Sequence, residues 1–241
     1  MKTIIRFGLI TLLAGSLVSA NAAPKDNVLD AAKKLGEKAN YSWTSTVVVP
    51  EGSRFRPGPT EGKTEKNGCT YLKLTIGDNT IQAVLKGDKA AITNPDVGWQ
   101  SLSELDTSEG RGRFASAMLR SFKTPAAQAA DLVAGAKELR QDGDSYASEL
   151  TEDAAKPLLT FGRRSGDDAP SVSNAKGSVK FWIKDGLLYK YEFKLSGKVT
   201  FNGNERDVDR TTTIEIKDIG STKVEVPDEA KKKLEPPAAA K

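Results

Sequence analysis

Alternating apolar and polar positions run through much of the chain and predict an antiparallel β-sheet. The strongest alternation lies in the second half, where one face of a long strand carries seven apolar or aromatic residues: Leu187, Tyr189, Tyr191, Phe193, Leu195, Val199 and Phe201. A period of two residues places alternate side chains on opposite faces of a strand. This face is therefore expected to be buried, either as a core or as the lining of a cavity.

The dipeptide Asn202-Gly203 predicts a two-residue hairpin turn that returns the chain along this strand. The turn fixes the following pairs: Tyr189 with Ile216, Tyr191 with Ile214, Phe193 with Thr212 and Gly197 with Val208. It also places Arg206 opposite Val199 and Arg210 opposite Leu195, on the apolar face. A charged group there must reach solvent at a rim, pair with an acid or meet an anionic head group.

Upstream of the strand, Asp185-Gly186 allows two turns. A two-residue turn places Phe181 and Ile183 on the face opposite to the aromatic one. A three-residue loop that includes Lys184, with Gly186 in the left-handed conformation, instead places Val179, Phe181 and Ile183 on the face of Leu187, Tyr189 and Tyr191. We favour the three-residue loop because it buries one face. Trp182 then lies on the other face.

The N-terminal half predicts a helix, a strand, a loop and a β-meander. A helix capped by Asp26 ends at Gly36, and a strand spans Tyr41–Val49. Residues 50–68 contain three Pro and four Gly and are expected to form a mobile loop that folding does not require. Two hairpins follow, centred on Asp78-Asn79 and Gly87-Asp88. The expected pairs are Leu72 with Leu85, Leu74 with Ala83, Ile76 with Ile81, Ala83 with Ile92 and Leu85 with Ala90.

Helical patterns separate this meander from the second β region. Ser101-Leu102-Ser103-Glu104 indicates a capped turn, and helices are expected over 112–122, 125–140 and from Thr151 onward, with a strand at 146–150. Residues 163–176 are expected to form a polar loop. The chain closes with a short strand at 223–226, a helix begun by Pro227 and a disordered tail, 235–241.

The first 22 residues have the pattern of an export signal. Lys2 and Arg6 precede an apolar stretch, and Ala20-Asn21-Ala22 provides small residues at a cleavage site. The apolar stretch is shorter than the roughly 20 residues that span a bilayer. We therefore expect cleavage after residue 22, one domain over 23–234 and a soluble periplasmic or extracellular protein without a transmembrane segment.

The composition excludes several kinds of chemistry. The chain contains no histidine and one cysteine, Cys69, which removes histidine-based catalysis, an intramolecular disulfide and Cys- or His-ligated metal sites. Loss of Lys2 and Arg6 with the signal lowers the net charge from +4 to +2, and the basic groups form no stripe that would favour nucleic acid. No cofactor-binding motif is present. We expect a protein that is not an enzyme and holds no metal or cofactor.

Three segments carry a resemblance to a known family: FWIKDG at 181–186, TIEIKDIG at 213–220 and VEVPDEA at 224–230. With the helix that leads into Tyr41-Ser42-Trp43, they resemble the periplasmic lipoprotein-carrier superfamily of LolA/LolB-like and LppX-type lipid-binding proteins. The resemblance spans most of residues 27–234. It implies an α+β fold: a curved antiparallel sheet, open as a half-barrel, with a helical insert and terminal helices covering a concave face that accepts acyl chains.

Two functions remain open at this point. In the first, the protein binds a lipid or a lipidated segment on the concave face, with these ligand-binding residues: Phe181, Tyr189, Tyr191, Phe193, Arg206, Arg210, Ile214 and Ile216. In the second, the same face is a filled core, and the chain is a structural or scaffolding protein of the envelope. The sequence leaves the ligand, the protein partners and the oligomeric state undetermined.

Overall fold

The computed structural model describes residues 23–53, 56–76, 79–108, 111–160 and 170–235. The proposed signal and almost all of the proposed tail lie outside these residues. The strands are β1 (Asn40–Val48), β2 (Thr60–Glu65), β3 (Thr70–Ile76), β4 (Asn79–Lys86), β5 (Lys89–Asn94), β6 (Gly98–Ser101), β7 (Arg140–Asp142), β8 (Ser145–Glu149), β9 (Ser171–Lys184), β10 (Leu187–Phe201) and β11 (Asn204–Lys217). The helices are α1 (Pro24–Gly36), α2 (Leu102–Asp106), α3 (Arg111–Ser121), α4 (Pro125–Gly135), α5 (Glu152–Leu159) and α6 (Asp228–Leu234).

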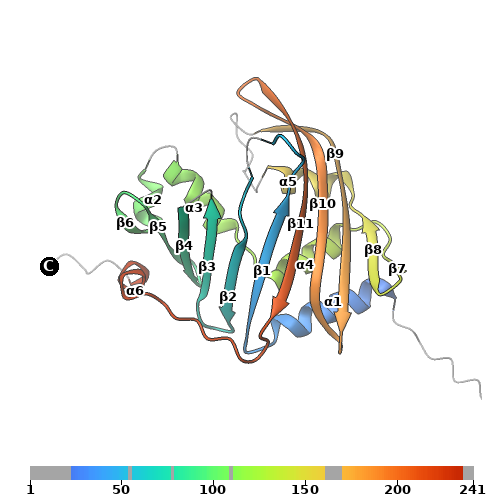
Figure 1. Cartoon of the computed structure of the whole chain (residues 1–241), viewed down its shortest axis with the longest axis horizontal. Coiled ribbons are helices and arrows are strands. Elements are labelled where there is room, and N and C mark those ends of the chain that lie inside the picture. Colours follow the sequence, from blue (N-terminus) through green and yellow to red (C-terminus); the bar gives the residue numbers. More distant parts are fainter. Residues whose placement is uncertain (1–22, 54–55, 77–78, 109–110, 161–169, 236–241) are drawn as a thin grey trace, which may run out of the picture.

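All the strands belong to one antiparallel sheet in the order β6-β5-β4-β3-β2-β1-β11-β10-β9-β8-β7. The sheet is curved and does not close, so β6 and β7 form its two edges (Figure 1). Helices α1, α4 and α5 lie on the concave side behind β9, β10 and β11, and α3 crosses behind β3 and β4 (Figure 1). This architecture confirms the α+β fold class and the open half-barrel.

The long hairpin β10–β11 has the register that Asn202-Gly203 predicts. Tyr191 pairs with Ile214, Phe193 with Thr212 and Gly197 with Val208, and Arg206 and Arg210 lie opposite Val199 and Leu195. Asn202 and Gly203 both have positive φ, 50° and 73°, as a two-residue turn of this type requires.

The three-residue loop predicted between β9 and β10 is wrong. Leu187 pairs with Lys184 across a two-residue turn, and Asp185 and Gly186 both have positive φ. The extra residue lies later, at Tyr189, where the register shifts between Leu188 and Lys190. This β-bulge places Phe181 opposite Tyr191, so these two residues share a face as predicted. It turns Tyr189 to the other face, so Leu188 is buried and Tyr189 is 37% exposed.

The loop predicted over residues 50–68 is also partly wrong, because it contains β2. This strand pairs with β1 and β3 near the middle of the sheet. Its inward positions carry small residues: the Thr64 and Thr70 hydroxyls lie 2.8 Å apart, and Gly62 faces Trp43. A Cβ atom at Gly62 would lie 2.0 Å from the Trp43 ring, so only glycine leaves space for the indole. Without apolar alternation, the strand has no hydrophobic signal in the sequence.

The register of one hairpin in the meander was predicted correctly, and that of the other was not. Ala83 pairs with Ile92 and Leu85 with Ala90, as predicted. In the preceding hairpin Leu72 pairs with Ala83 rather than with Leu85. The other predicted pairs, Leu74 with Ala83 and Ile76 with Ile81, are wrong by the same shift of two residues. A shift of two keeps every side chain on its predicted face, so the hydrophobic pattern did not distinguish the two registers.

Several helix ends and one strand differ from the prediction. Helix α1 begins at Pro24, with Ala23 rather than Asp26 at the N-cap, and α4 ends at Gly135 rather than at residue 140. A Cβ at Gly135 would lie 2.4 Å from the Ala154 Cβ, so α4 closely approaches α5 there. The polar loop predicted at 163–176 is wrong from Ser171 onward, where β9 begins, and its residues 163–169 lie outside the described part of the chain. The short strand predicted at 223–226 is also wrong, because these residues belong to no strand.

Helix α6 packs on the opposite, convex face of the sheet, so the prediction that both terminal helices cover the concave face is wrong for α6. Its Ala230 and Leu234 form a second buried cluster with Val84, Ala91 and Trp99 of β4, β5 and β6. Lys233 of α6 donates a hydrogen bond to Glu104, which also caps α2 through the Ser101 backbone N–H. Strands β4–β6 are therefore anchored on their convex side by the C-terminal helix.

Candidate functional site

Five of the eight predicted ligand-binding residues are buried beneath the helices on the concave face. Phe181, Tyr191, Phe193, Ile214 and Ile216 belong to the main hydrophobic cluster together with residues of α1, α4 and α5. Phe181 and Tyr191 stack with ring centroids 6.2 Å apart, and the Tyr191 hydroxyl donates to Gln128 Oε1 of α4 at 2.7 Å. Burial raises the pKa of Tyr191 well above its usual value. These residues form the packed core between the sheet and α1, α4 and α5.

The other three predicted residues are separated from one another. Tyr189 lies on the bulge and Arg206 is exposed on β11, near the tip of the hairpin. Arg210 is half-buried, and its Nη2 donates to the Leu158 carbonyl oxygen of α5 at 2.5 Å. Burial lowers the pKa of Arg210 to about 10, so the guanidinium remains charged at neutral pH. Arg210 thus ties β11 to α5 at one end of the concave face.

Some apolar side chains of the concave face near α3 are only partly covered. Leu74 and Ile81 pair with each other on β3 and β4, and both are only partly buried. Met118 of α3 and Phe122, which directly follows α3, are also partly buried against the same hydrophobic cluster. The Phe122 ring stacks on Trp43 at a centroid distance of 6.4 Å and an interplanar angle of 22°. We call Leu74, Ile81, Met118 and Phe122 the α3 lining.

Small and polar residues separate the α3 lining from the packed core. Strand pairing places Ser45 of β1 between Ile214 and Thr60, and Thr60 next to Leu74. Thr212 lies two residues along β11 from Ile214, beside Phe193 and Val47. We call Ser45, Thr60 and Thr212 the hydroxyl strip. Sequence reasoning missed it because β2 was assigned to a loop, although the small residues at Thr60, Gly62 and Thr64 have the period of a strand.

The described residues contain no group of three acidic, cysteine or histidine side chains that could hold a metal ion. Cys69 is half-buried, and burial raises the pKa of its thiol, which favours the less reactive protonated form. Within the same described part of the chain, no helix is both long and apolar enough to cross a membrane. The described residues of the concave face offer apolar contacts, hydroxyls and the guanidinium groups of Arg206 and Arg210.

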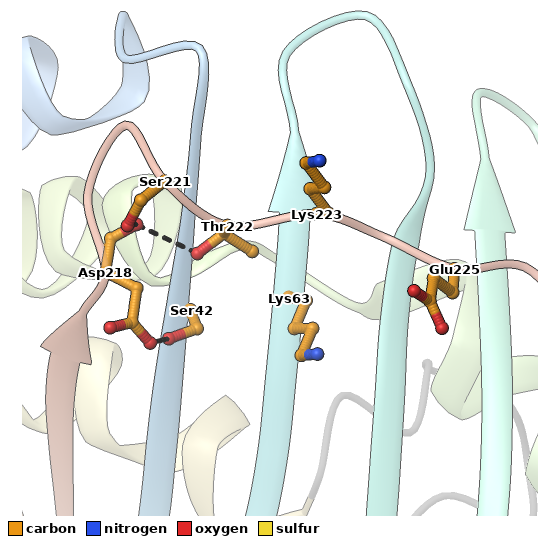
Figure 2. Close-up of a pocket in the computed structure, with 7 residues that line it drawn as sticks. All are labelled: Ser42, Lys63, Asp218, Ser221, Thr222, Lys223 and Glu225. Atoms are coloured by element: carbon orange, nitrogen blue, oxygen red, sulfur yellow. Dashed lines mark hydrogen bonds between the residues drawn. The ribbon is translucent and has the colours of Figure 1, made fainter.

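A pocket of about 340 Å³ lies on the convex side, where the chain crosses the sheet after β11. Figure 2 shows the residues that line it: Ser42, Lys63, Asp218, Ser221, Thr222, Lys223 and Glu225. The Ser42 hydroxyl donates to Asp218 Oδ2 at 2.7 Å, and the Thr222 hydroxyl donates to the Asp218 carbonyl oxygen at 2.9 Å. These bonds hold the segment that carries the chain to α6.

A wider hollow of about 560 Å³ lies at the β7–β9 end of the sheet. Its charged side chains are paired with one another: Lys137 with Glu149, Arg140 with Glu138 and Lys180 with Asp142. All of these pairs are largely exposed, so each contributes little to stability. Neither this hollow nor the pocket in Figure 2 includes a predicted ligand-binding residue.

No family model matches the chain, and no curated protein sequence matches it. Solved structures do match. Lipoprotein LppX from Mycobacterium tuberculosis is 12% identical, with a TM-score of 0.47, over 83% of this chain and 97% of that chain. LprF from Mycobacterium bovis is 10% identical, with a TM-score of 0.46, over 86% and 97%. A DUF1329 family protein from Desulfovibrio piger is 10% identical, with a TM-score of 0.32, over 81% and 92%. The LppX type of protein named by the sequence resemblance is thus among the structures to which this chain is similar.

Proposed function

We propose that this chain is an exported envelope protein that binds an apolar or amphipathic ligand, such as a lipid or a lipidated segment, on its concave face. The observation that carries the proposal is the contrast within that face. Large side chains such as Phe181 and Tyr191 are fully buried, whereas those of the α3 lining remain partly exposed on the inner side of a curved sheet. Partly exposed apolar side chains on a concave surface are typical of a binding site for hydrocarbon.

The geometry favours a site beneath α3 over a site at the aromatic side chains of β9 and β10. Phe181, Tyr191 and Phe193 are at most 6% exposed, and a ligand there would have to displace α1 and α4. Beneath α3, a ligand would contact Leu74 and Ile81 on one side and the helix on the other. The stacked pair Trp43 and Phe122 then forms the boundary of the site toward the packed core. The export signal of residues 1–22 would place this site outside the cytoplasm.

A probe titration tests the proposal. Purified protein without the signal should increase the fluorescence of 1-N-phenylnaphthylamine, an apolar probe, in a saturable manner. Ile81→Trp adds bulk to the α3 lining and should weaken probe binding by about tenfold or more, while leaving the thermal midpoint nearly unchanged. The matched control is Val97→Trp, at a position between β5 and β6 that is 64% exposed. A folded wild type that does not bind the probe would leave the structural or scaffolding function in its place.

Native mass spectrometry of protein purified from its own host provides an independent test. A mass in excess of the polypeptide that is lost on extraction with organic solvent would reveal the natural ligand. A spectrum with the polypeptide mass alone, together with failure to bind the probe, would contradict the proposal.

A further inference from the structure

The hydroxyl of Thr212 is exceptional among the buried polar side chains. The described part of the chain has seven buried polar residues: Thr64, Thr70, Ser116, Ser145, Thr160, Thr212 and Thr222. The other six each form a side-chain hydrogen bond with another side chain or with a backbone carbonyl. Thr212 is 8% exposed, and its hydroxyl bonds to no described residue. A hydroxyl in such a position ordinarily has a partner.

The Thr212 hydroxyl nevertheless borders accessible space. No fully covered side-chain nitrogen or oxygen among the described residues lacks a hydrogen-bond partner. Because Thr212 has no such partner, its oxygen must remain in contact with a space that a water molecule can reach. The register of β11 places this side chain on the concave face, between Val47 and Phe193. The Thr212 hydroxyl therefore lies on the concave side at a place that a water molecule can reach.

Two further hydroxyls lie on the same face beside Thr212. Ser45 is on β1 and pairs with Ile214, so it is diagonal to Thr212, about 7–8 Å away across adjacent strands. Thr60 pairs with Ser45 on the next strand, and Leu74 of the α3 lining pairs with Thr60. Like Thr212, the Ser45 and Thr60 side chains form no hydrogen bond with a described residue. The three hydroxyls thus extend from the centre of the face to the edge of the α3 lining.

We propose that the hydroxyl strip binds the uncharged polar head of an amphipathic ligand, an ester or a hydroxyl as in an acylglycerol, whose hydrocarbon contacts the α3 lining. This inference rests on the proposed function and defines the ligand class. A hydroxyl both donates and accepts, so three of them suit a head group with ester carbonyls and hydroxyls. The inward positions of β1 and β2 beside the strip carry no charged residue, which favours a neutral head.

The alternative to a neutral head group at the hydroxyl strip is an anionic head group at Arg210. It lies two residues from Thr212 on the same face of β11 and retains its charge beside the Leu158 carbonyl. A ligand with an anionic head would approach this guanidinium rather than the hydroxyls. The comparison of neutral and anionic heads on the same acyl chain therefore separates the two modes of binding.

The test is displacement of bound 1-N-phenylnaphthylamine by three ligands with the same chain length: 1-monopalmitin, palmitate and hexadecane. Wild type should bind monopalmitin most tightly. A triple variant should bind monopalmitin about tenfold more weakly, without a change in its affinity for the probe. It combines Ser45→Ala, Thr60→Val and Thr212→Val. Thr212→Ser should restore part of the loss when it replaces Thr212→Val, because it keeps the hydroxyl.

The control combines Thr44→Val, Thr46→Val and Thr211→Val, which alter the opposite face of β1 and β11 and should leave all three affinities unchanged. Near-ultraviolet circular dichroism confirms that each variant is folded. Equal affinity of the triple variant and wild type for monopalmitin, or a preference of wild type for palmitate, overturns the hydroxyl subsite and leaves the proposed function intact. A wild type that binds neither the probe nor any of the three ligands overturns both.

Discussion

The half of the concave face formed by β9, β10 and β11 differs from the half formed by β1–β4 in how its side chains are covered. In the first half, α1, α4 and α5 seal aromatic residues such as Phe181 and Tyr191 completely. In the second half, Leu74 and Ile81 stay partly exposed beneath α3, and the adjoining positions carry hydroxyls and a glycine. One sheet thus combines a group of fully covered aromatic side chains with apolar side chains that remain partly exposed. The strong aromatic alternation of β10 thus belongs to the packed core, whereas the candidate site lies on strands with a weaker apolar pattern.

The largest expected effect distinguishes the two halves by stability. Phe181→Ala removes a fully buried ring and should lower the free energy of unfolding by about 3–5 kcal/mol. Leu74→Ala removes a side chain that is already partly exposed and should cost about 1 kcal/mol. Urea denaturation of both variants measures the difference. Equal losses would show that the β1–β4 half is packed as tightly as the core.

Gly62→Ala tests the boundary between the halves. The added Cβ would lie 2.0 Å from the Trp43 ring, so the indole must move and its stacking on Phe122 must change. We expect a loss of about 1–3 kcal/mol from overpacking and an altered tryptophan emission spectrum. Lys63→Ala, at the next position on β2 but exposed, is the control and should change neither property. An unchanged spectrum for Gly62→Ala would contradict the close packing of Trp43 on β2.

Two tyrosines separated by the bulge provide a smaller contrast. Tyr191→Phe removes the hydroxyl that donates to Gln128 in the core and should cost about 0.5–1.5 kcal/mol. Tyr189→Phe alters an exposed residue and should change stability by less than about 0.5 kcal/mol. Thermal unfolding of the two variants compares them directly. A cost for Tyr189→Phe as large as that for Tyr191→Phe would indicate that both side chains lie on the inward face, as the predicted three-residue loop requires.

The sequence was informative where apolar alternation and turn chemistry agree. Asn202-Gly203 determined the register of β10 and β11 because both turn residues adopt positive φ with little cost. It was uninformative where a strand contains no apolar side chain. Strand β2 is held by its neighbours, and its inward glycine is explained by Trp43, a residue far from it in the sequence.

The candidate site could be predicted only in part for the same reason. The alternating aromatic residues of β10 can be recognised in the sequence, but their burial depends on α1, α4 and α5, whose positions follow from tertiary packing. The bulge at Tyr189 occurs in place of the three-residue loop that the pattern favoured, so the predicted face of that side chain was wrong. The hydroxyl strip joins residues from β1, β2 and β11, which are adjacent only in the folded sheet.

The smallest expected effect concerns the convex side of the less filled half, where α6 is attached through Glu104. The hydrogen bond from Lys233, followed by that from the Ser101 backbone N–H, lowers the pKa of the Glu104 carboxyl to about 2. A carboxyl whose pKa is lower in the folded state stabilises the protein above the unfolded value, near 4.5, and loses this contribution as the pH falls toward 2.

Glu104→Gln should therefore lower stability at pH 7 by less than about 1 kcal/mol, because the carboxylate is largely exposed to solvent. The difference in thermal midpoint between wild type and variant should shrink as the pH falls from about 5 toward 2, where the wild-type carboxyl also becomes neutral. Glu229→Gln on α6 is the control, since Glu229 forms no ion pair with a described residue. A difference that is independent of pH would rule out the charged contact as the cause. Because α6 and the α3 lining lie on opposite faces of the sheet, Glu104→Gln should leave the affinity for the apolar probe unchanged.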